Sequence, residues 1–445
     1  MLEKLRNIFK IPELRKRIIF TLSIFVIYRI GGHIPVPGID TGVLSEFFEQ
    51  QANTLFGLYD LFAGGNFSRA TIFALGIMPY ISASIIIQLL GTVVPAIQKL
   101  QQSGDEGRKK ITQWTRYGTV GLAGAQALGT AAFLAGIQLG GLKVVPNAHI
   151  GFYLLTMITL TAGTTFLMWL GEQIDERGIG NGISLLIFAG IIQRFPSAII
   201  NEARLIGEGI RSPMMGLVLV GILVLTTAAV VLLTQGSRKI PVQYTKRVVG
   251  RRMYGGQSTH IPLRVNTAGV MPIIFAQTIM FFPQTIASFI PQEGALQGLH
   301  DWLNTAFGFT SYIYMIFYGL LIIFFTYFYT AVAFNPQDVA SNLKKNGGHI
   351  PGQKPGKQTA RYLDNILTRI TLPGSIFLAL IAVFPTLLSK FTDVGFNLTS
   401  FFGGTSLLIV VGVALDTLQQ IDSHLLMRHY DGLMKSGRMK GRRRM

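Results

Sequence analysis

Ten apolar stretches, each about as long as the 20 residues that cross the hydrocarbon of a bilayer, divide the chain. They lie at roughly residues 18–34, 71–94, 114–137, 151–171, 182–200, 213–235, 268–290, 309–333, 370–388 and 403–421. Charged residues make up only 13% of the chain, about half the share usual in soluble proteins. The sequence therefore predicts an all-α polytopic membrane protein with ten transmembrane helices.

The Lys and Arg residues predict how these helices are oriented. Of the 39, 31 fall in one alternating set of connecting segments and 5 in the other, while Arg29, Arg116 and Arg194 lie inside spans. Short cytoplasmic loops carry the excess of Lys and Arg. We therefore expect both the N-terminal segment 1–17 and the basic tail 422–445 to be cytoplasmic. Most of the net charge of +18 then reports topology, although basic loops could also contact ribosomal RNA.

One phrase of eight residues occurs twice in the chain. GIMPYISA at 76–83 and GVMPIIFA at 269–276 are identical at five positions and lie 193 residues apart. They fall in the second and the seventh predicted helix, so ten helices divide into two sets of five with opposite orientations. Inverted repeats of this kind place their pathway between the halves. The alternative is a chance likeness of two apolar segments.

Each copy of the phrase contains a proline, Pro79 or Pro272. A proline inside a helix removes one backbone hydrogen bond and bends the helix. In lipid, the freed carbonyl needs a protein partner or a water-filled cavity. The two prolines therefore predict two kinked helices that line an interior, although a kink that serves only packing is common in membrane proteins.

The spans offer little ionisable chemistry. Ion-coupled transporters place charged side chains inside the membrane, and here Asp416 is the one serious candidate for a buried carboxylate. The segment PGQKPGKQT at 351–359 lacks the first Gly and the hydroxyl of a phosphate-binding loop. The chain has no Cys, and no catalytic constellation or metal motif occurs in it. We expect neither enzyme activity nor a cofactor, and an inverted-repeat secondary transporter of a small solute is the alternative to a channel.

Three connecting segments are unusually long. Residues 236–267 and 334–369 are rich in Lys, Arg, Gly and Pro, which is typical either of flexible tethers or of a docking surface for an acidic partner. Residues 35–70, on the opposite side, end in TLFGLYDLFAGGNFSRA. That stretch is apolar but too short to span, so it is either a re-entrant segment or an amphipathic turn on the surface.

Longer stretches resemble the SecY family of bacterial protein-conducting channels. They are IPELRKRI at 11–18, RIGGHIPVPGID at 29–40, FALGIMPYISASIIIQLL at 73–90, GEQIDERGIGNGIS at 171–184, YGGQSTHIPLRVNTAGVMP at 254–272, FNPQDVASNLKKNGG at 334–348 and FGGTSLLIVVGVALD at 402–416. The resemblance implies two inverted five-helix halves around a central pore, residues 18–200 and 213–421, joined by an external hinge loop at 201–212. Signal sequences would leave through a lateral gate between helices 2 and 7.

The resemblance also implies where each function resides. The family's ring of aliphatic residues at the pore waist matches Ile77, Ile81, Ile183, Ile187, Ile274 and Ile409. Its lateral gate matches Ser82, Gln88, Asn266 and Phe282, and its docking loops match Lys246, Arg247, Arg251, Arg252 and Lys354. Its plug, a short helix below the ring, matches Leu55, Phe56, Gly57, Leu58, Tyr59, Asp60, Leu61, Phe62, Ala63, Gly64, Gly65, Asn66, Phe67, Ser68 and Arg69.

Family membership would bring several partners. The expected ones are the small subunits SecE and SecG, the motor ATPase SecA, the translating ribosome, secretory preproteins with their signal sequences, and membrane lipid. A dimer of complexes is a further expectation. Lys354 departs from the Arg usual in the family's IPGxRPG turn; Lys keeps the charge but lacks the planar fork. The expected location is the inner (plasma) membrane, as a multi-pass protein that conducts chains passively.

Overall fold

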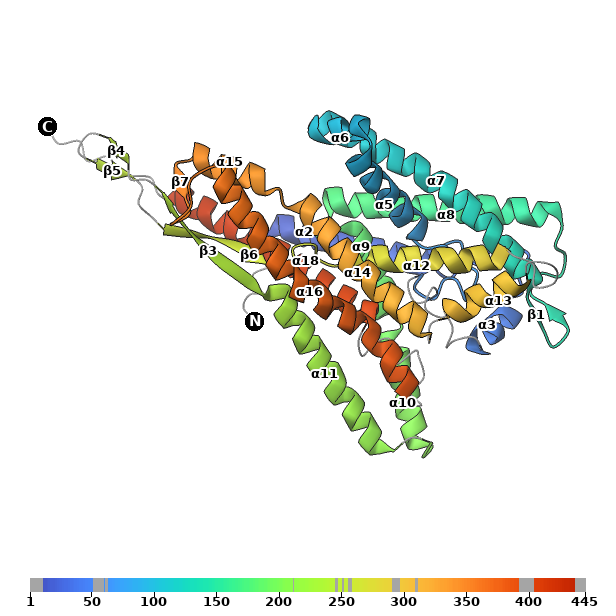
Figure 1. Cartoon of the computed structure of the whole chain (residues 1–445). Helices are drawn as coiled ribbons and strands as arrows, with labels where there is room; N and C mark the ends of the chain where they lie inside the picture. Colours follow the sequence, from blue (N-terminus) through green and yellow to red (C-terminus); the bar gives the residue numbers. More distant parts are fainter. Residues whose placement is uncertain are drawn as a thin grey trace. The chain divides into compact units, whose positions relative to one another are not determined.

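A computed structural model of the chain describes residues 11–50, 60, 63–210, 212–244, 247–249, 252–254, 258–289, 297–308, 311–391 and 404–436 (Figure 1). The chain divides into two compact units. The first comprises Met1–Ala52, Phe56–Ser197 and Val413–Met445, and the second comprises Asn53–Leu55 and Ala198–Gly412. The C-terminal helix α18 (Gly404–Ser436) contributes to both.

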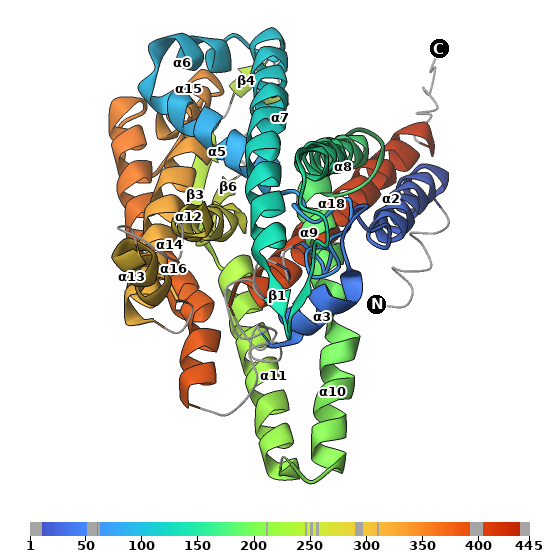
Figure 2. The ribbon, with the colours of Figure 1, turned by 90° about the vertical axis from the view of Figure 1, so that its right-hand side faces the viewer.

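The first unit is built almost entirely of helices. They are α2 (Pro12–Gly31), α3 (Thr41–Gln50), α5 (Met78–Val93), α6 (Pro95–Gln102), α7 (Asp105–Gly136), α8 (Ile150–Arg177), α9 (Gly182–Ile192) and the second part of α18. A short hairpin, β1 (Gln138–Leu139) and β2 (Leu142–Lys143), joins α7 to α8. Helix α7 packs against both α5 and α8 (Figure 2). Arg116 of α7 also binds Glu172 of α8 through two parallel hydrogen bonds of 2.8 Å.

The second unit combines helices with two small sheets. Its helices are α10 (Phe195–Gly207, which begins at the end of the first unit), α11 (Pro213–Gln235), α12 (Met271–Phe289), α13 (Gln297–Ala306), α14 (Tyr312–Ala333), α15 (Pro336–Lys345) and α16 (Lys357–Phe391). Its strands are β3 (Ser237–Tyr244), β4 (Arg247–Val249), β5 (Arg252–Tyr254), β6 (Ser258–Arg264) and β7 (Gly348–His349). Helix α14 packs against both α12 and α16 (Figure 2).

Every one of the ten predicted spans contains a helix. Among the described residues, seven helical stretches are long and apolar enough to cross a membrane, and the bent pair α5–α6 would make an eighth. Helix α2 carries four charged residues in its first turns, and α12 has only a short apolar part, Met271–Phe281. The chain is therefore a multi-span membrane protein, and ten spans fit this arrangement.

Polar side chains fix where several of these helices begin. Asn181, Ser212, Ser311 and Asn335 precede α9, α11, α14 and α15, and each side chain accepts a hydrogen bond from a backbone N–H of the first turn. Such residues satisfy donors that have no partner within the helix. Helix α10 runs to Gly207, so most of the predicted hinge loop 201–212 is helical.

The repeated phrase forms the same structure twice, but not the one predicted from its prolines. Pro79 and Pro272 are the second residues of α5 and α12, so the prediction of two kinks at these sites is wrong. Proline is well tolerated in a helix's first turn, where its missing N–H would have no helical partner. The prolines that do lie inside described helices are Pro283, Pro373 and Pro385.

The glycine of each copy turns the chain into its helix. Gly76 has φ +57° and Gly269 has φ +65°, both in the left-handed region. Two residues later the helices begin, and the Ile81 N–H donates to the Ile77 carbonyl at 3.2 Å. The equivalent bond in the second copy joins Ile274 to Val270 at 3.3 Å. The repeated eight-residue sequence thus forms the start of a helix in the same way in both copies.

This geometry predicts that the glycines matter more than the prolines. Pro79→Ala and Pro272→Ala are expected to lower stability by less than about 1 kcal/mol, because a backbone N–H at either position has no helical acceptor and neither change removes a helical hydrogen bond. Gly76→Ala and Gly269→Ala are expected to cost about 1–2 kcal/mol each, because a Cβ is disfavoured at positive φ. Apparent melting temperatures of the purified protein in detergent would measure both. A larger loss from the prolines would contradict this account.

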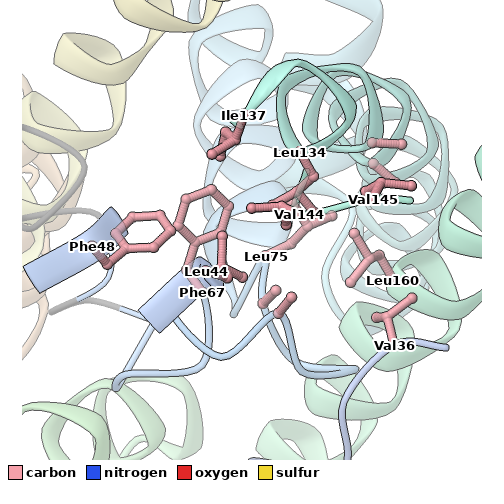
Figure 3. Packing of buried hydrophobic residues seen from close by; sticks show 14 of the residues in the cluster. Val36, Leu44, Phe48, Phe67, Leu75, Leu134, Ile137, Val144, Val145 and Leu160 are labelled. Carbon is pink, nitrogen blue, oxygen red and sulfur yellow. The ribbon is translucent and has the colours of Figure 1, made fainter. Parts of the chain in front are cut away.

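An apolar cluster holds the segment before α5 inside the first unit. Phe67 packs edge-on against Phe48 of α3, with ring centroids 5.3 Å apart, and stacks on Phe133 of α7 at 6.4 Å. Leu75 and Val144 are almost fully buried in the same cluster (Figure 3). Side chains from α3, α7, α8 and the β1–β2 hairpin therefore share one core with residues 63–75.

The two basic loops are not the flexible tethers considered from the sequence, as far as they are described. Strand β3 pairs antiparallel with both β6 and β7. Its buried residues Ile240 and Val242 pack in a core with Leu343 of α15 and Leu363 of α16. Strands β4 and β5 form a separate antiparallel pair. The loops thus build a small folded region on the end of α16.

Candidate functional site

The six residues matched to the pore ring are mostly buried. Ile77 and Ile81 lie one turn apart at the start of α5, with exposed fractions of 6% and 4%. In α9, Ile187 is buried, whereas Ile183 is half-buried and packs over Gly171 of α8. In the second unit, Ile274 lies on the first turn of α12 and Ile409 on α18, exposed by 3% and 0%. Both units therefore present buried isoleucines near helix starts.

The segment matched to the plug is described at Asp60 and from Ala63 onward; Leu55, Phe56, Gly57, Leu58, Tyr59, Leu61 and Phe62 lie outside the described residues. Asp60 is helical, whereas residues 63–69 form turns and bends and no helix, so a plug helix does not extend through 63–69. The Asn66 carbonyl accepts hydrogen bonds from both the backbone N–H and the hydroxyl of Thr71. These bonds make the 63–71 segment compact.

The residues matched to the lateral gate make local hydrogen bonds. The Ser82 hydroxyl donates to the Met78 carbonyl at 3.0 Å, and Gln88 Nε2 donates to Ser84 Oγ at 3.1 Å, both within α5. Asn266 precedes α12 and donates through Nδ2 to the Gly269 carbonyl at 3.0 Å, which supports the turn of the second repeat. The side chain of Phe282 lies outside the described part of α12. Pairing across a gate stays a prediction.

The residues matched to the docking loops are described unevenly. Lys246 and Arg251 lie outside the described residues, and of Arg247 and Arg252 only the backbone is described, at the ends of the β4–β5 pair. Lys354 is exposed on a turn after β7. Its carbonyl accepts a hydrogen bond of 2.9 Å from the Thr359 hydroxyl. This bond fixes the turn that presents the lysine.

The carboxylate on which the transporter alternative depends is not buried. Asp416, on the part of α18 that belongs to the first unit, is exposed. A transporter needs its charged residue in the bundle interior. The structure therefore does not favour the transporter.

Comparison with known sequences shows to which family the chain belongs. The sequence model of the SecY family matches residues 71–418. Protein translocase subunit SecY of Haemophilus influenzae is 46% identical over 429 residues, which cover 96% of this chain and 96% of the relative. The chain belongs to the SecY family. SecY of Escherichia coli K12 is 46% identical over 433 residues, with 96% of each chain covered. SecY of Aquifex aeolicus is 44% identical over 437 residues, which cover 98% of this chain and all of the relative.

Solved structures agree on the fold of this SecY-family chain. One described as a protein conducting channel has a TM-score of 0.66 at 20% identity, covering 98% of this chain and 99% of the other. Sec61 in a canine ribosome–channel complex has a TM-score of 0.61 at 19% identity, with the same coverage. At such identities the likeness concerns the fold alone.

The sequence missed the polar residues that hold the 63–71 segment of this SecY-family chain. Arg194 and Gln193 form the turn between α9 and α10, and both contact the segment. From the sequence, Arg194 is only one of three basic residues that lie inside predicted spans. Its partner Asp60 lies 134 residues earlier, so no local spacing signals the pair.

Proposed function

We propose that this chain is the pore-forming subunit of a protein-conducting channel, which passes secretory preproteins across the membrane and releases signal sequences and membrane segments into lipid. One observation carries the proposal. Two matched helix starts, each with a buried isoleucine, occur in a chain 46% identical to protein translocase subunits over nearly its full length. Residues 18–200 and 213–421 would be the two halves around the pore.

The pore ring would consist of Ile77, Ile81, Ile183, Ile187, Ile274 and Ile409. Branched apolar side chains can close around an extended peptide of any sequence, because they form no hydrogen bonds that would retain it. In other channels, hydrophobic constrictions close the pore by excluding water. The chain itself would do no chemistry, so the energy for transport would come from a partner.

The plug and the lateral gate would keep this pore closed at rest. One related solved structure concerns the plug domain of SecY, which is described as stabilising the closed state and maintaining a membrane seal. In this chain the corresponding part would be residues 55–69. The gate would lie between α5 and α12, with Ser82, Gln88, Asn266 and Phe282 along it. Interhelical polar contacts are worth only about 1 kcal/mol in membranes, which suits a gate that opens.

The docking surface for the motor ATPase SecA and the ribosome would be the β4–β5 pair with its neighbouring residues and the turn after β7. Lys246, Arg247, Arg251, Arg252 and Lys354 would supply its positive charge. Related channels of known structure occur in ribosome complexes, both canine Sec61 and yeast Ssh1. SecE and SecG would be the small membrane partners. The location would be the inner membrane, and the basic loops favour a cytoplasmic position for both termini.

A crosslink in mid-transit tests the proposal. The chain has no Cys, so Ile81→Cys introduces a single thiol. A secretory precursor with one cysteine in its mature part, stalled during transport, is expected to form a disulfide with it. Ile86→Cys is the matched control, because Ile86 lies on the exposed side of the same helix. A crosslink at Ile86 and none at Ile81, with the precursor engaged, would place the path elsewhere.

A further inference from the structure

The 63–71 segment is tied to the turn between α9 and α10 by polar contacts that the channel function does not by itself require. We propose that this turn is a latch: Arg194 and Gln193 are positioning residues that hold the segment in its seated position and set how readily it leaves. The inference rests on the proposed function, in which this segment belongs to the plug. All residues that carry it lie in the first unit.

The first tie is an ion pair at Asp60. Arg194 donates from Nη2 to one carboxylate oxygen, Oδ2. The other, Oδ1, accepts the backbone N–H groups of Phe67 and Ser68 at 3.0 and 2.8 Å. The Asp60 side chain is only 4% exposed and that of Arg194 24%. Asp60 thus organises the turn of the segment with one oxygen and binds the latch with the other.

The second tie runs through Gln193. Its Nε2 donates to the Gly64 carbonyl, while its Oε1 accepts a hydrogen bond from Arg29 at the end of α2. Arg29 therefore orients the side chain of Gln193 that binds the segment. The amide of Gln193 has both ends engaged, so it is held in one position.

The segment also lies very close to α2 and α9. A Cβ added to Gly64 would lie 2.8 Å from the Cα of Gly190 in α9 and 2.6 Å from the hydroxyl of Tyr28. That hydroxyl donates to the Ala63 carbonyl at 3.3 Å and accepts from Asn66 Nδ2 at 3.2 Å. The seated position is therefore specified by polar contacts and by shape together.

Two features make this a latch and not only local packing. First, both contacts come from adjacent residues of one turn and reach a single segment about 130 positions earlier in the chain. They are therefore lost together when the segment moves. Second, Arg194 lies three residues before Ser197, where the chain passes from the first unit to the second. Arg194 therefore lies in the turn that precedes α10, next to the chain connection between the two units.

Breaking such a pair on one side is costly to the seated state. A buried ion pair gains little over an apolar pair, but removal of one partner leaves an uncompensated buried charge. Arg194→Met leaves the Asp60 carboxylate without its cation. Asp60→Asn retains an oxygen for the two N–H groups of the turn and removes the charge that binds Arg194. Both variants are therefore expected to unseat the segment, whereas Arg194→Lys keeps the charge and the seating.

The test measures access to the segment in the full-length protein with its membrane partners in lipid vesicles. Ser68 is half-buried, so a Ser68→Cys thiol reports exposure of the segment. Thr326 is buried in α14 of the second unit, so a Thr326→Cys thiol reports general unfolding. A maleimide labels each reporter in separate preparations. The quantity measured is the labelling rate of the first divided by that of the second.

Arg194→Met and Asp60→Asn are each expected to raise this ratio about tenfold or more, and the double variant no further than either alone, since both remove one interaction. Arg194→Lys is expected to restore most of the wild-type ratio. Arg204→Met, on an exposed Arg of α10, is the matched control and leaves the ratio unchanged. An unchanged ratio in Arg194→Met or Asp60→Asn overturns the latch, whether or not the variant is less stable.

Translocation by the same vesicles separates the two proposals. If wild-type vesicles transport a precursor but the ratio does not respond, the latch is wrong and the channel stands. If wild-type vesicles with all partners present transport nothing, the channel function fails. With a working channel, Arg194→Met is expected to export a precursor with a defective signal sequence several-fold better than wild type, and Arg194→Lys is not.

Discussion

Ile409→Asn is expected to let precursors with defective signal sequences through at several times the wild-type rate. Ile409 is fully buried on α18, and an asparagine there would place an amide among apolar side chains. An unpaired buried amide costs about 1–3 kcal/mol. If the residue belongs to a closed apolar ring, that cost falls on the closed state and is relieved when the pore opens to water or peptide.

Ile81→Gly should act in the same direction by a different route. It removes a buried side chain from the start of α5, and loss of a large aliphatic side chain typically costs about 2–5 kcal/mol. Part of any effect would come from the low helix propensity of glycine, about 1 kcal/mol. Ile86→Gly corrects for that part, because it makes the same change on the exposed side of the same helix.

The measurement is export of a reporter whose signal sequence carries a charge in its apolar region. Ile409→Asn, Ile81→Gly and Ile77→Gly should each raise export, while Ile409→Val and Ile86→Gly should not. Wild-type behaviour of all three ring variants would show that these isoleucines are ordinary core residues. A rise with Ile86→Gly equal to that with Ile81→Gly would attribute the effect to helix loosening.

The spans could be predicted because the bilayer dictates their length. Each apolar stretch contains a helix, but the ends differ where polar residues continue it. Helix α7 begins at Asp105, nine residues before the predicted span at 114–137, since hydropathy detects only the apolar part of a helix. Conversely, residues 71–77 are apolar but form turns before α5. This is why Pro79 was wrongly placed in a helix interior.

The sequence contains a local pattern that predicts strand β3, although the basic composition of its loop suggests a flexible segment. In β3, buried Ile240 and Val242 alternate with exposed residues, the period of two that marks a half-buried strand. The Lys, Arg and Gly content of the loop instead favours a charged tether or docking surface. The latch had no such signal, because Asp60 and Arg194 meet only through the tertiary fold. Long-range ion pairs of this kind follow from the packing of helices and not from sequence spacing.

Gly163→Ala is expected to destabilise the protein strongly, although alanine is the better helix former by about 1 kcal/mol. Gly163 lies in the middle of α8, and a Cβ there would lie 1.9 Å from the carbonyl oxygen of Ile72. That neighbour is backbone, and the Ile72 N–H is in turn bonded to the Ile34 carbonyl at 3.0 Å. Neither chain can yield without losing hydrogen bonds, so we expect a cost at or above the 1–3 kcal/mol typical of overpacking.

Gly121→Ala is the control that makes this test sharp. Gly121 lies in α7, and nothing outside its own helix backbone comes within 4 Å of a Cβ added there. The same substitution should therefore be neutral or stabilising at Gly121, through propensity alone. The apparent melting temperature of the purified protein in detergent would be compared for wild type and both variants. A Gly163→Ala variant that melts at or above the wild-type temperature would show that α8 does not pack against the chain at Ile72 as closely as the structure places it. The 63–71 segment, which directly precedes Ile72, would then be supported less from the side of α8 than its contacts imply.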